Sequence, residues 1–218
     1  MNKYDLSLCR NIIWDWNGTL LNDLSVCVSS INLLLGKRNI PLLNIERYLD
    51  IFTFPVKEYY VTAGFNFNEE PFETVAIEFM DHYLRLVRTT GLHTEAKAAL
   101  SWFRNTSRQQ IILSAMEHNE LVKLVYEHGI QEYFSHIFGI DDHLANGKLA
   151  LAQSTIEKTG FSLEETCLIG DTLHDAEVAT KLGINCLLIA DGHQSEERLI
   201  ASGFQVIKSL REVEKIFG

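Results

Sequence analysis

The chain has 218 residues, 46% of them hydrophobic, and is therefore long enough to form one sizeable core with a smaller unit inserted into it. Its formal net charge of −10 and its pI near 5.2 argue against the dense basic surface that binding to nucleic acid or to an anionic membrane requires. We therefore expect a globular enzyme that acts on a small molecule, with neither nucleic acid nor membrane as a partner.

The cysteines and the apolar runs point to a cytoplasmic protein. The cysteines form no CxxC pair and no zinc-type cluster, so we expect reduced, buried thiols. No run approaches the roughly 18 apolar residues that suggest a membrane span, and the first ten residues lack the apolar stretch of a signal peptide. The sequence leaves the oligomeric state open between monomer and homodimer. The four cysteines are Cys9, Cys27, Cys167 and Cys186.

The first predicted strand covers residues 11–15 and ends in Asp15, which is followed by Trp16-Asn17-Gly18-Thr19. A carboxylate at the end of a buried strand, directly before a Gly-Thr turn, is placed where a nucleophile would be exposed. The alternative is that Asp15 only caps the helix that follows, as an aspartate before a turn commonly does. This segment alone does not decide between the two.

Residues 23–88 are predicted to be helical throughout, without a strand. Apolar residues recur there at helical spacing, and the core pattern resumes only near Thr94. We therefore predict a helical cap domain at 23–88, inserted into a core domain formed by residues 1–22 and 89–218. The apolar positions are Val26, Ile31, Leu34 and Leu35, and then Phe72, Val75, Phe79 and Tyr83.

The rest of the chain alternates strands with helices. Short apolar runs predict further strands at 110–114, 167–171 and 185–190, and helical patterns that end before a glycine cover 118–128, 148–159 and 173–182. This alternation predicts right-handed crossovers and an α/β fold with a doubly wound, Rossmann-like parallel sheet. In such sheets the active site lies at the carboxyl ends of the strands.

A second acidic site follows the strand at 167–171, where Asp171 and Asp175 flank the start of a helix. Two such acids beside Asp15 would repel one another unless a hard cation lay between them, and oxygen ligands suit Mg²⁺. The alternative is an N-cap aspartate with a first-turn aspartate that the helix dipole favours.

Taken together, the motifs resemble those of the haloacid-dehalogenase superfamily. They are Asp-x-Asn-Gly-Thr-Leu near the N-terminus, a strand that ends in Ser114, Lys148, and Gly-Asp-Thr-x-x-Asp at 170–175. The resemblance covers almost the whole chain and looks most like the phosphoglycolate-phosphatase branch with a helical cap. It implies an Mg²⁺-dependent phosphatase that acts on a small phosphorylated metabolite through an aspartyl-phosphate.

The resemblance also implies roles for individual residues. It makes Asp15 the nucleophile, and it makes Ser114 and Lys148 catalytic groups that stabilise the phosphoryl oxygens. The implied metal ligands are Asp15, Asp171, Asp175 and the backbone carbonyl of Asn17. The implied substrate-binding residues are Thr19, Ser114, Ala115 and Lys148.

Asn17 departs from the family pattern, because phosphatases of this family place a second aspartate there as general acid and base. An amide can do neither. Three interpretations follow: a phosphatase for a substrate that has a good leaving group or carries its own acid, a weakened protein that binds a phospho-ligand, or an enzyme that resembles phosphonoacetaldehyde hydrolases. The last would use Lys57 to form a Schiff base, although a surface charge is the simpler interpretation of Lys57.

Three histidines follow predicted strand ends and could face the site. They are His118, His174 and His193. Their spacing gives no metal triad with the acids, so ordinary loop histidines are expected. The sequence does not identify the natural substrate.

Overall fold

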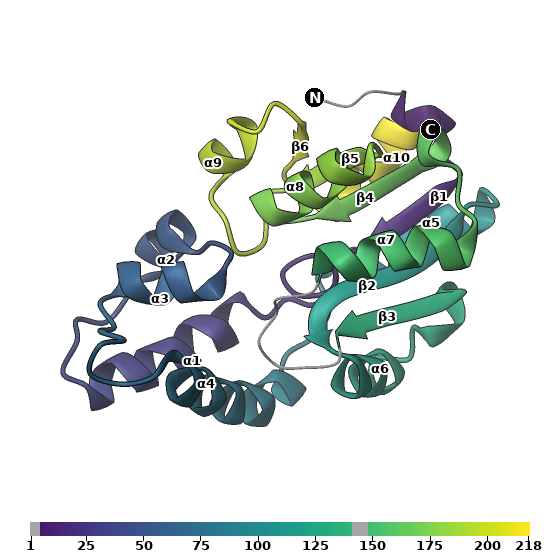
Figure 1. Ribbon diagram of the computed structural model, residues 1–218. Helices are drawn as coiled ribbons and strands as arrows, with labels where there is room; N and C mark the ends of the chain where they lie inside the picture. The colour runs from purple at the N-terminus through teal and green to yellow at the C-terminus, as the bar shows by residue number, and fades with distance from the viewer. Residues whose placement is uncertain (1–4, 141–147) are drawn as a thin grey trace.

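The computed structural model describes residues 5–140 and 148–218. Its centre is a six-stranded parallel sheet with the strand order β3-β2-β1-β4-β5-β6 (Figure 1). The predicted doubly wound parallel sheet is confirmed. The strands are β1 (Asn11–Trp14), β2 (Gln109–Glu117), β3 (His136–Ile140), β4 (Thr166–Gly170), β5 (Asn185–Ile189) and β6 (Gln205–Ile207).

Helices cover both faces of the sheet, because neighbouring residues of a strand point to opposite sides. In β1, Ile12 and Trp14 belong to one apolar layer and Ile13 to the other. The first layer receives α5 (Ala96–Asn105), α6 (His118–Glu127) and α10 (Val213–Phe217). The second receives α7 (Lys148–Thr159), α8 (Leu173–Leu182) and α9 (Glu196–Ile200).

The strand order reverses between β1 and β4, which lie side by side with Trp14 in register with Ile169. The chain runs outward from β1 through β2 to β3, and then returns to add β4, β5 and β6 on the other side. Crevices form at such a reversal, beyond the carboxyl ends of the two strands. The residues that follow β1 and β4 are Asp15 and Asp171, so the fold brings both predicted acids to this point.

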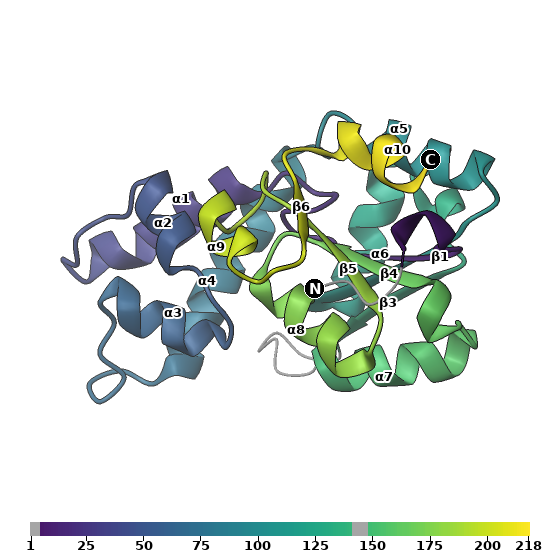
Figure 2. The ribbon, with the colours of Figure 1, turned by 90° about the horizontal axis from the view of Figure 1, so that it is seen from above.

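Between β1 and α5 the chain forms the helical insertion, residues 24–86, which lies beyond the carboxyl ends of the strands (Figure 2). Helix α1 packs against α4, and the Arg38 guanidinium that follows α1 is bonded to Glu70 and Glu78. The predicted helical character is confirmed, while the division into two domains stays a prediction. The helices are α1 (Leu24–Lys37), α2 (Ile45–Ile51), α3 (Val56–Ala63) and α4 (Phe72–Leu86).

Strands β3 and β6 were not predicted, and both lie at the edges of the sheet. An edge strand is only partly covered, so its sequence lacks the continuous apolar run of a central strand. His136 is exposed and β6 has three residues, of which Gln205 is exposed. Single 3₁₀ turns connect other elements at Leu6–Leu8, Val87–Thr89, Gln131–Tyr133, Leu163–Glu165 and Leu210–Glu212. Within residues 5–140 and 148–218, no helix is long and apolar enough to cross a membrane.

Candidate active site

The loop after β1 places Asp15 at the reversal point of the sheet. The Asp15 amide donates to the Ile169 carbonyl at 2.9 Å, which continues the pairing of β1 with β4 by one residue. Gly18 then turns the chain with φ = 70°, and a Cβ atom at Gly18 would lie 2.3 Å from Asp171 Oδ2. Only glycine fits this turn, since a side chain would meet both the backbone strain and the carboxylate.

Asp15, Asp171 and Asp175 form one buried cluster, in which one oxygen from each side chain lies within 4.8 Å of the others. Asp171 accepts hydrogen bonds from the Thr19 hydroxyl at 3.1 Å and from the His193 amide at 2.6 Å. Asp175 lies in the first turn of α8 and forms a capping box with the N-cap residue Thr172. Asp175 is therefore both a first-turn aspartate and a member of the cluster, whereas the N-cap is Thr172 and not an aspartate.

Lys148 lies against the cluster from the start of α7. Its Nζ atom is 2.5 Å from Asp15 Oδ1 and 2.7 Å from Asp175 Oδ1, and the side chain is buried. One buried cation thus faces three buried carboxylates, which leaves a formal charge of −2. A divalent cation would balance that charge, and oxygen ligands are those that Mg²⁺ prefers.

The cluster is electrostatically costly without such a cation. Burial raises the pKa of Asp15 to about 8, and Asp175 and Asp171 add to the rise although Lys148 opposes it. Burial also raises the pKa of Asp171 to about 6. The contacts with Lys148 outweigh burial at Asp175, whose pKa is lowered. Repulsion between like charges of this kind is what a bound cation relieves.

Other predicted substrate-binding residues take different places. Ser114 and Ala115 line the cavity beside Asp15, and the Ser114 hydroxyl oxygen accepts from the Met116 amide at 3.1 Å. That bond leaves the Ser114 proton free to be donated. Thr19 is fully buried, bonds Asp171 and does not line the cavity, so its geometry supports a role in orienting Asp171 rather than in touching substrate.

Asn17 is held by a side chain that the sequence interpretation missed. Its Nδ2 atom donates to Asp23 Oδ2 at 2.8 Å and to the Tyr83 hydroxyl at 2.6 Å. Because an ionised carboxylate only accepts hydrogen bonds, the amide atom beside Asp23 must be the nitrogen. The donor side of Asn17 is thus directed to these partners.

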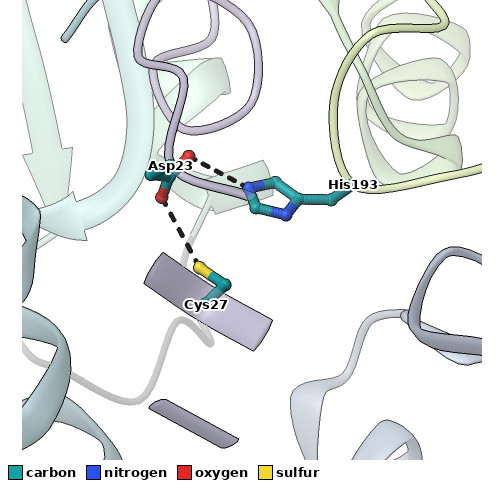
Figure 3. A group of neighbouring side chains, drawn as sticks. All are labelled: Asp23, Cys27 and His193. Atoms are coloured by element: carbon teal, nitrogen blue, oxygen red, sulfur yellow. Dashed lines mark hydrogen bonds and ion pairs between the residues drawn. The ribbon is translucent and has the colours of Figure 1, made fainter. Parts of the chain in front are cut away.

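Asp23 is the centre of a second buried cluster, with Cys27 of α1 and with His193 from the loop after β5 (Figure 3). Asp23 Oδ1 accepts from His193 Nε2 at 3.1 Å and from the Gly18 amide at 2.9 Å. Asp23 Oδ2 accepts from the Tyr83 hydroxyl at 2.8 Å as well as from Asn17. This carboxylate is therefore saturated with protein donors.

The expectation of an ordinary loop histidine is wrong for His193. Its side chain is 4% exposed, lines the cavity and forms an ion pair with Asp23. Burial alone would raise the pKa of Asp23, but His193 and the donors lower it to about 2. Burial would likewise lower the pKa of His193, but Asp23 raises it to about 9. Sequence could not pair two residues 170 positions apart, and Asp23 resembles an ordinary helix N-cap.

The remaining candidates lie outside the centre of the site. His118 is exposed, while His174 stacks on Phe54 with ring centroids 4.7 Å apart. Lys57 is exposed, lies over the rings of Phe67 and Phe72, and does not line the cavity. The position of Lys57 gives no support to a Schiff base at the site.

A cavity of about 160 Å³ connects the two acidic clusters with the helical insertion. Its floor includes Asp15, Ser114, Lys148 and Asp171 from the core. Its opposite wall consists of side chains from α2, α3 and α4 and the segments between them. A substrate in this cavity would place one end against Asp15 and the other against the insertion.

Comparison with known proteins finds relatives that match almost the whole chain. A curated 5'-nucleotidase of Pseudomonas aeruginosa is 24% identical over 202 residues, which cover 88% of this chain and 87% of that protein. A haloacid dehalogenase-like family protein from Streptococcus pneumoniae has a similar structure, with a TM-score of 0.83, 17% identity, and coverage of 97% of this chain and 100% of that one.

A predicted phosphoglycolate phosphatase from Haemophilus somnus has a TM-score of 0.76 and 18% identity, over 97% of this chain and 99% of that one. The family model for haloacid dehalogenase-like hydrolases matches residues 12–189, which include both acidic motifs, Ser114 and Lys148. The chain belongs to the haloacid dehalogenase-like hydrolase family.

Proposed function

We propose that the protein is an Mg²⁺-dependent phosphohydrolase that acts on a small phosphorylated metabolite through an aspartyl-phosphate on Asp15. The observation that carries the proposal is the formal charge of −2 on the buried cluster of three carboxylates and Lys148. Asp171, Asp175, the free oxygen of Asp15 and the backbone carbonyl of Asn17 would hold the ion. When bound, Mg²⁺ would supply positive charge to the phosphoryl oxygens and to the carboxylates.

Each side chain of the site has its own role in the proposed reaction. A carboxylate oxygen of Asp15 attacks phosphorus, and the bond from phosphorus to the leaving group breaks. Lys148 donates to the phosphoryl oxygens, because its ammonium lies 2.5 Å from Asp15. The Ser114 hydroxyl also donates, from within β2, which continues to Glu117 and does not end at Ser114 as predicted. Asp175 keeps Lys148 in place at 2.7 Å. Water then attacks the phosphorus and frees Asp15.

The helical insertion covers the carboxyl edge of the sheet, so substrate must pass between the insertion and the core. We propose that residues 23–88 act as a cap that opens to admit substrate and closes to exclude water. The contacts of Tyr48 and Asp23 of the cap with His193 of the core would hold the closed arrangement.

The test is to trap the covalent intermediate. Borohydride reduces an acyl phosphate of aspartate to homoserine, so the enzyme is quenched with borohydride during Mg²⁺-dependent hydrolysis of 4-nitrophenyl phosphate. We expect homoserine at position 15 in the peptide digest, with chelator and Asp15→Asn as controls that give none. Homoserine elsewhere, or full hydrolysis by Asp15→Asn, would contradict the proposal.

The two alternative functions receive less support. The Schiff-base mechanism would use Lys57, which is exposed and does not line the cavity. Lys148 does line the cavity, but it is held in ion pairs with Asp15 and Asp175. A protein that only binds a phospho-ligand has no need for an acid with a raised pKa beside a buried lysine, yet Asp15 and Lys148 are both present.

A further inference from the structure

The cavity has two chemically different walls. The core side carries the charged groups of the proposed phosphoryl site, Asp15, Lys148 and Asp171. The opposite side, here called the aromatic wall, contains eleven residues from helices α2, α3 and α4 and the segment between α2 and α3. None of these residues is charged. They are Tyr48, Phe52, Phe54, Val56, Tyr59, Tyr60, Phe72, Ala76, Phe79, Met80 and Tyr83.

Polar atoms of the aromatic wall are largely engaged with the protein. The Tyr48 hydroxyl lies 3.1 Å from His193 Nδ1, and the Tyr83 hydroxyl donates to Asp23. The Tyr59 hydroxyl is buried and has no hydrogen-bond partner among residues 5–140 and 148–218. A ligand group against this wall would therefore meet mainly ring faces and methyl groups.

The cavity has room for about one ring. Its volume of about 160 Å³ is similar to that of an engineered apolar cavity of ~150 Å³ that holds benzene. A sugar or a polyol in this space would leave several hydroxyls without the hydrogen bonds that they make in water. Shape and polarity thus favour a flat, apolar ring.

The second observation is that, among the cavity-lining residues of 5–140 and 148–218, no carboxylic acid is left free to protonate a leaving group. Asn17 replaces the acid, and its nitrogen is bonded to Asp23 and Tyr83. The Glu117 carboxylate, also in the lining, accepts the Asn119 and Glu120 amides at the start of α6. A leaving group that needs a proton would depart slowly here, whereas a phenolate departs without one.

From these two observations we infer that the substrate is an aryl phosphate, a phosphate monoester of a ring hydroxyl, whose ring lies against the aromatic wall. This inference rests on the proposed phosphohydrolase function. The phosphorus–oxygen bond to the ring breaks as the bond to Asp15 forms, and the phenolate leaves with the electron pair. Water then attacks phosphorus and loses one proton, and the bond between phosphorus and the Asp15 oxygen breaks, which restores the carboxylate. The phenolate takes up one proton, so the products are a phenol and inorganic phosphate.

Binding tests the wall separately from catalysis. The probes are phenylphosphonate, which carries the ring and cannot be hydrolysed at a phosphorus–oxygen ester bond, and methylphosphonate, which lacks the ring. With Mg²⁺ present, calorimetry should show that phenylphosphonate binds the full chain at least roughly 10-fold more tightly, the scale of discrimination by an apolar pocket. Equal affinities would overturn the inference.

Two variants on α4 locate the ring. Met80→Glu places a charge in the aromatic wall and should remove most of the preference for phenylphosphonate. The matched control is Ile77→Glu, on the same helix, where the side chain is 60% exposed and does not line the cavity. If Met80→Glu does not fold, Met80→Gln tests the same contact with less disturbance. Preference retained in a folded Met80 variant would place the ring elsewhere and overturn the inference.

Hydrolysis assays then distinguish a failure of the aryl-phosphate inference from a failure of the proposed phosphohydrolase function. Four substrates combine the presence or absence of a ring with a good or a poor leaving group. They are 4-nitrophenyl phosphate (ring, good), acetyl phosphate (no ring, good), benzyl phosphate (ring, poor) and ethyl phosphate (no ring, poor). We expect the highest kcat/KM for 4-nitrophenyl phosphate, a higher KM for acetyl phosphate, slow turnover of benzyl phosphate and the slowest of ethyl phosphate. If kcat/KM is the same with and without a ring for leaving groups of the same quality, the aryl-phosphate inference is overturned while the phosphohydrolase function stands. No Mg²⁺-dependent hydrolysis of any of them, with phenylphosphonate still preferred, would overturn the function while the ring site stands.

Discussion

Two buried acidic clusters face the same cavity, and their charge balance differs. In the first, Asp15, Asp171 and Asp175 are opposed by Lys148, so the formal sum is −2. In the second, Asp23 is opposed by a protonated His193, so the sum is zero. Each cluster also brings three potential ligand atoms within 4.8 Å of one another, so geometry alone does not distinguish them as metal sites.

The pKa values show what the difference means. The pKa of Asp15 is raised to about 8 by burial and neighbouring carboxylates, whereas that of Asp23 is lowered to about 2 by His193 and other donors. Burial of charge is thus uncompensated in the first cluster and compensated in the second. We therefore propose that the first cluster binds a cation and that the second is a structural ion pair between the core and the insertion.

The largest expected effect comes from Asp171→Asn, which removes a proposed ligand from the unbalanced cluster. We expect hydrolysis to fall by roughly 10²- to 10³-fold, as it does when transition-state charge stabilisation is lost at other active sites. Without Mg²⁺, the melting temperature should stay level or rise, because one source of repulsion is removed. Hydrolysis assays and thermal melts with and without Mg²⁺ measure both. A large loss of stability without Mg²⁺ would contradict the account.

For the cluster of Asp23 and His193, whose formal charges sum to zero, we expect a large loss of stability and little change in Mg²⁺ binding. His193→Gln leaves Asp23 buried without its cation, which should lower the free energy of unfolding by about 3 to 5 kcal/mol, the usual cost of breaking a buried pair. The affinity for Mg²⁺ should change little, because neither side chain is a proposed ligand. Urea unfolding and Mg²⁺ titration of the same variant test this. Stability equal to that of the wild type would contradict the account.

The stability that this pair contributes should depend on pH at both ends. The pKa of Asp23 is lowered to about 2 from 3.8, so its contribution is present above pH 3.8 and is lost as pH falls through 2. The pKa of His193 is raised to about 9 from 6.5, so its contribution is complete below pH 6.5 and is lost as pH rises through 9. The difference between wild type and His193→Gln should therefore shrink from pH 6.5 to 9. A constant difference over that range would contradict the account.

A smaller effect is expected from adding a carboxylate beside Asp23. Asn17→Asp would put a second carboxylate where Asn17 Nδ2 now lies 2.8 Å from Asp23, and should destabilise the protein by about 1 to 3 kcal/mol. The double variant Asn17→Asp with Asp23→Asn restores one acid and one amide and should recover part of that loss. A double-mutant cycle from urea unfolding measures the coupling. Additive losses would show that the two side chains do not interact.

The sequence predicted much of the first cluster but little of the second. Asp15 and Asp171 end buried parallel strands, and apolar runs of that kind are local features of the sequence. Asp23 and His193 meet only because the insertion and the loop after β5 fold over the same edge of the sheet. The edge strands β3 and β6 were missed for a related reason, since partial exposure removes their apolar signal.

The central claim, that charge balance decides which cluster binds metal, is tested by the number and place of bound ions. Mg²⁺ is titrated by calorimetry, and Co²⁺ by its absorption, which reports a thiolate ligand. We predict one ion per chain, lost in Asp171→Asn and retained in Cys27→Ser, with no thiolate band. A second bound ion, with a thiolate band that disappears in Cys27→Ser, would show that the balanced cluster binds metal and would contradict the account.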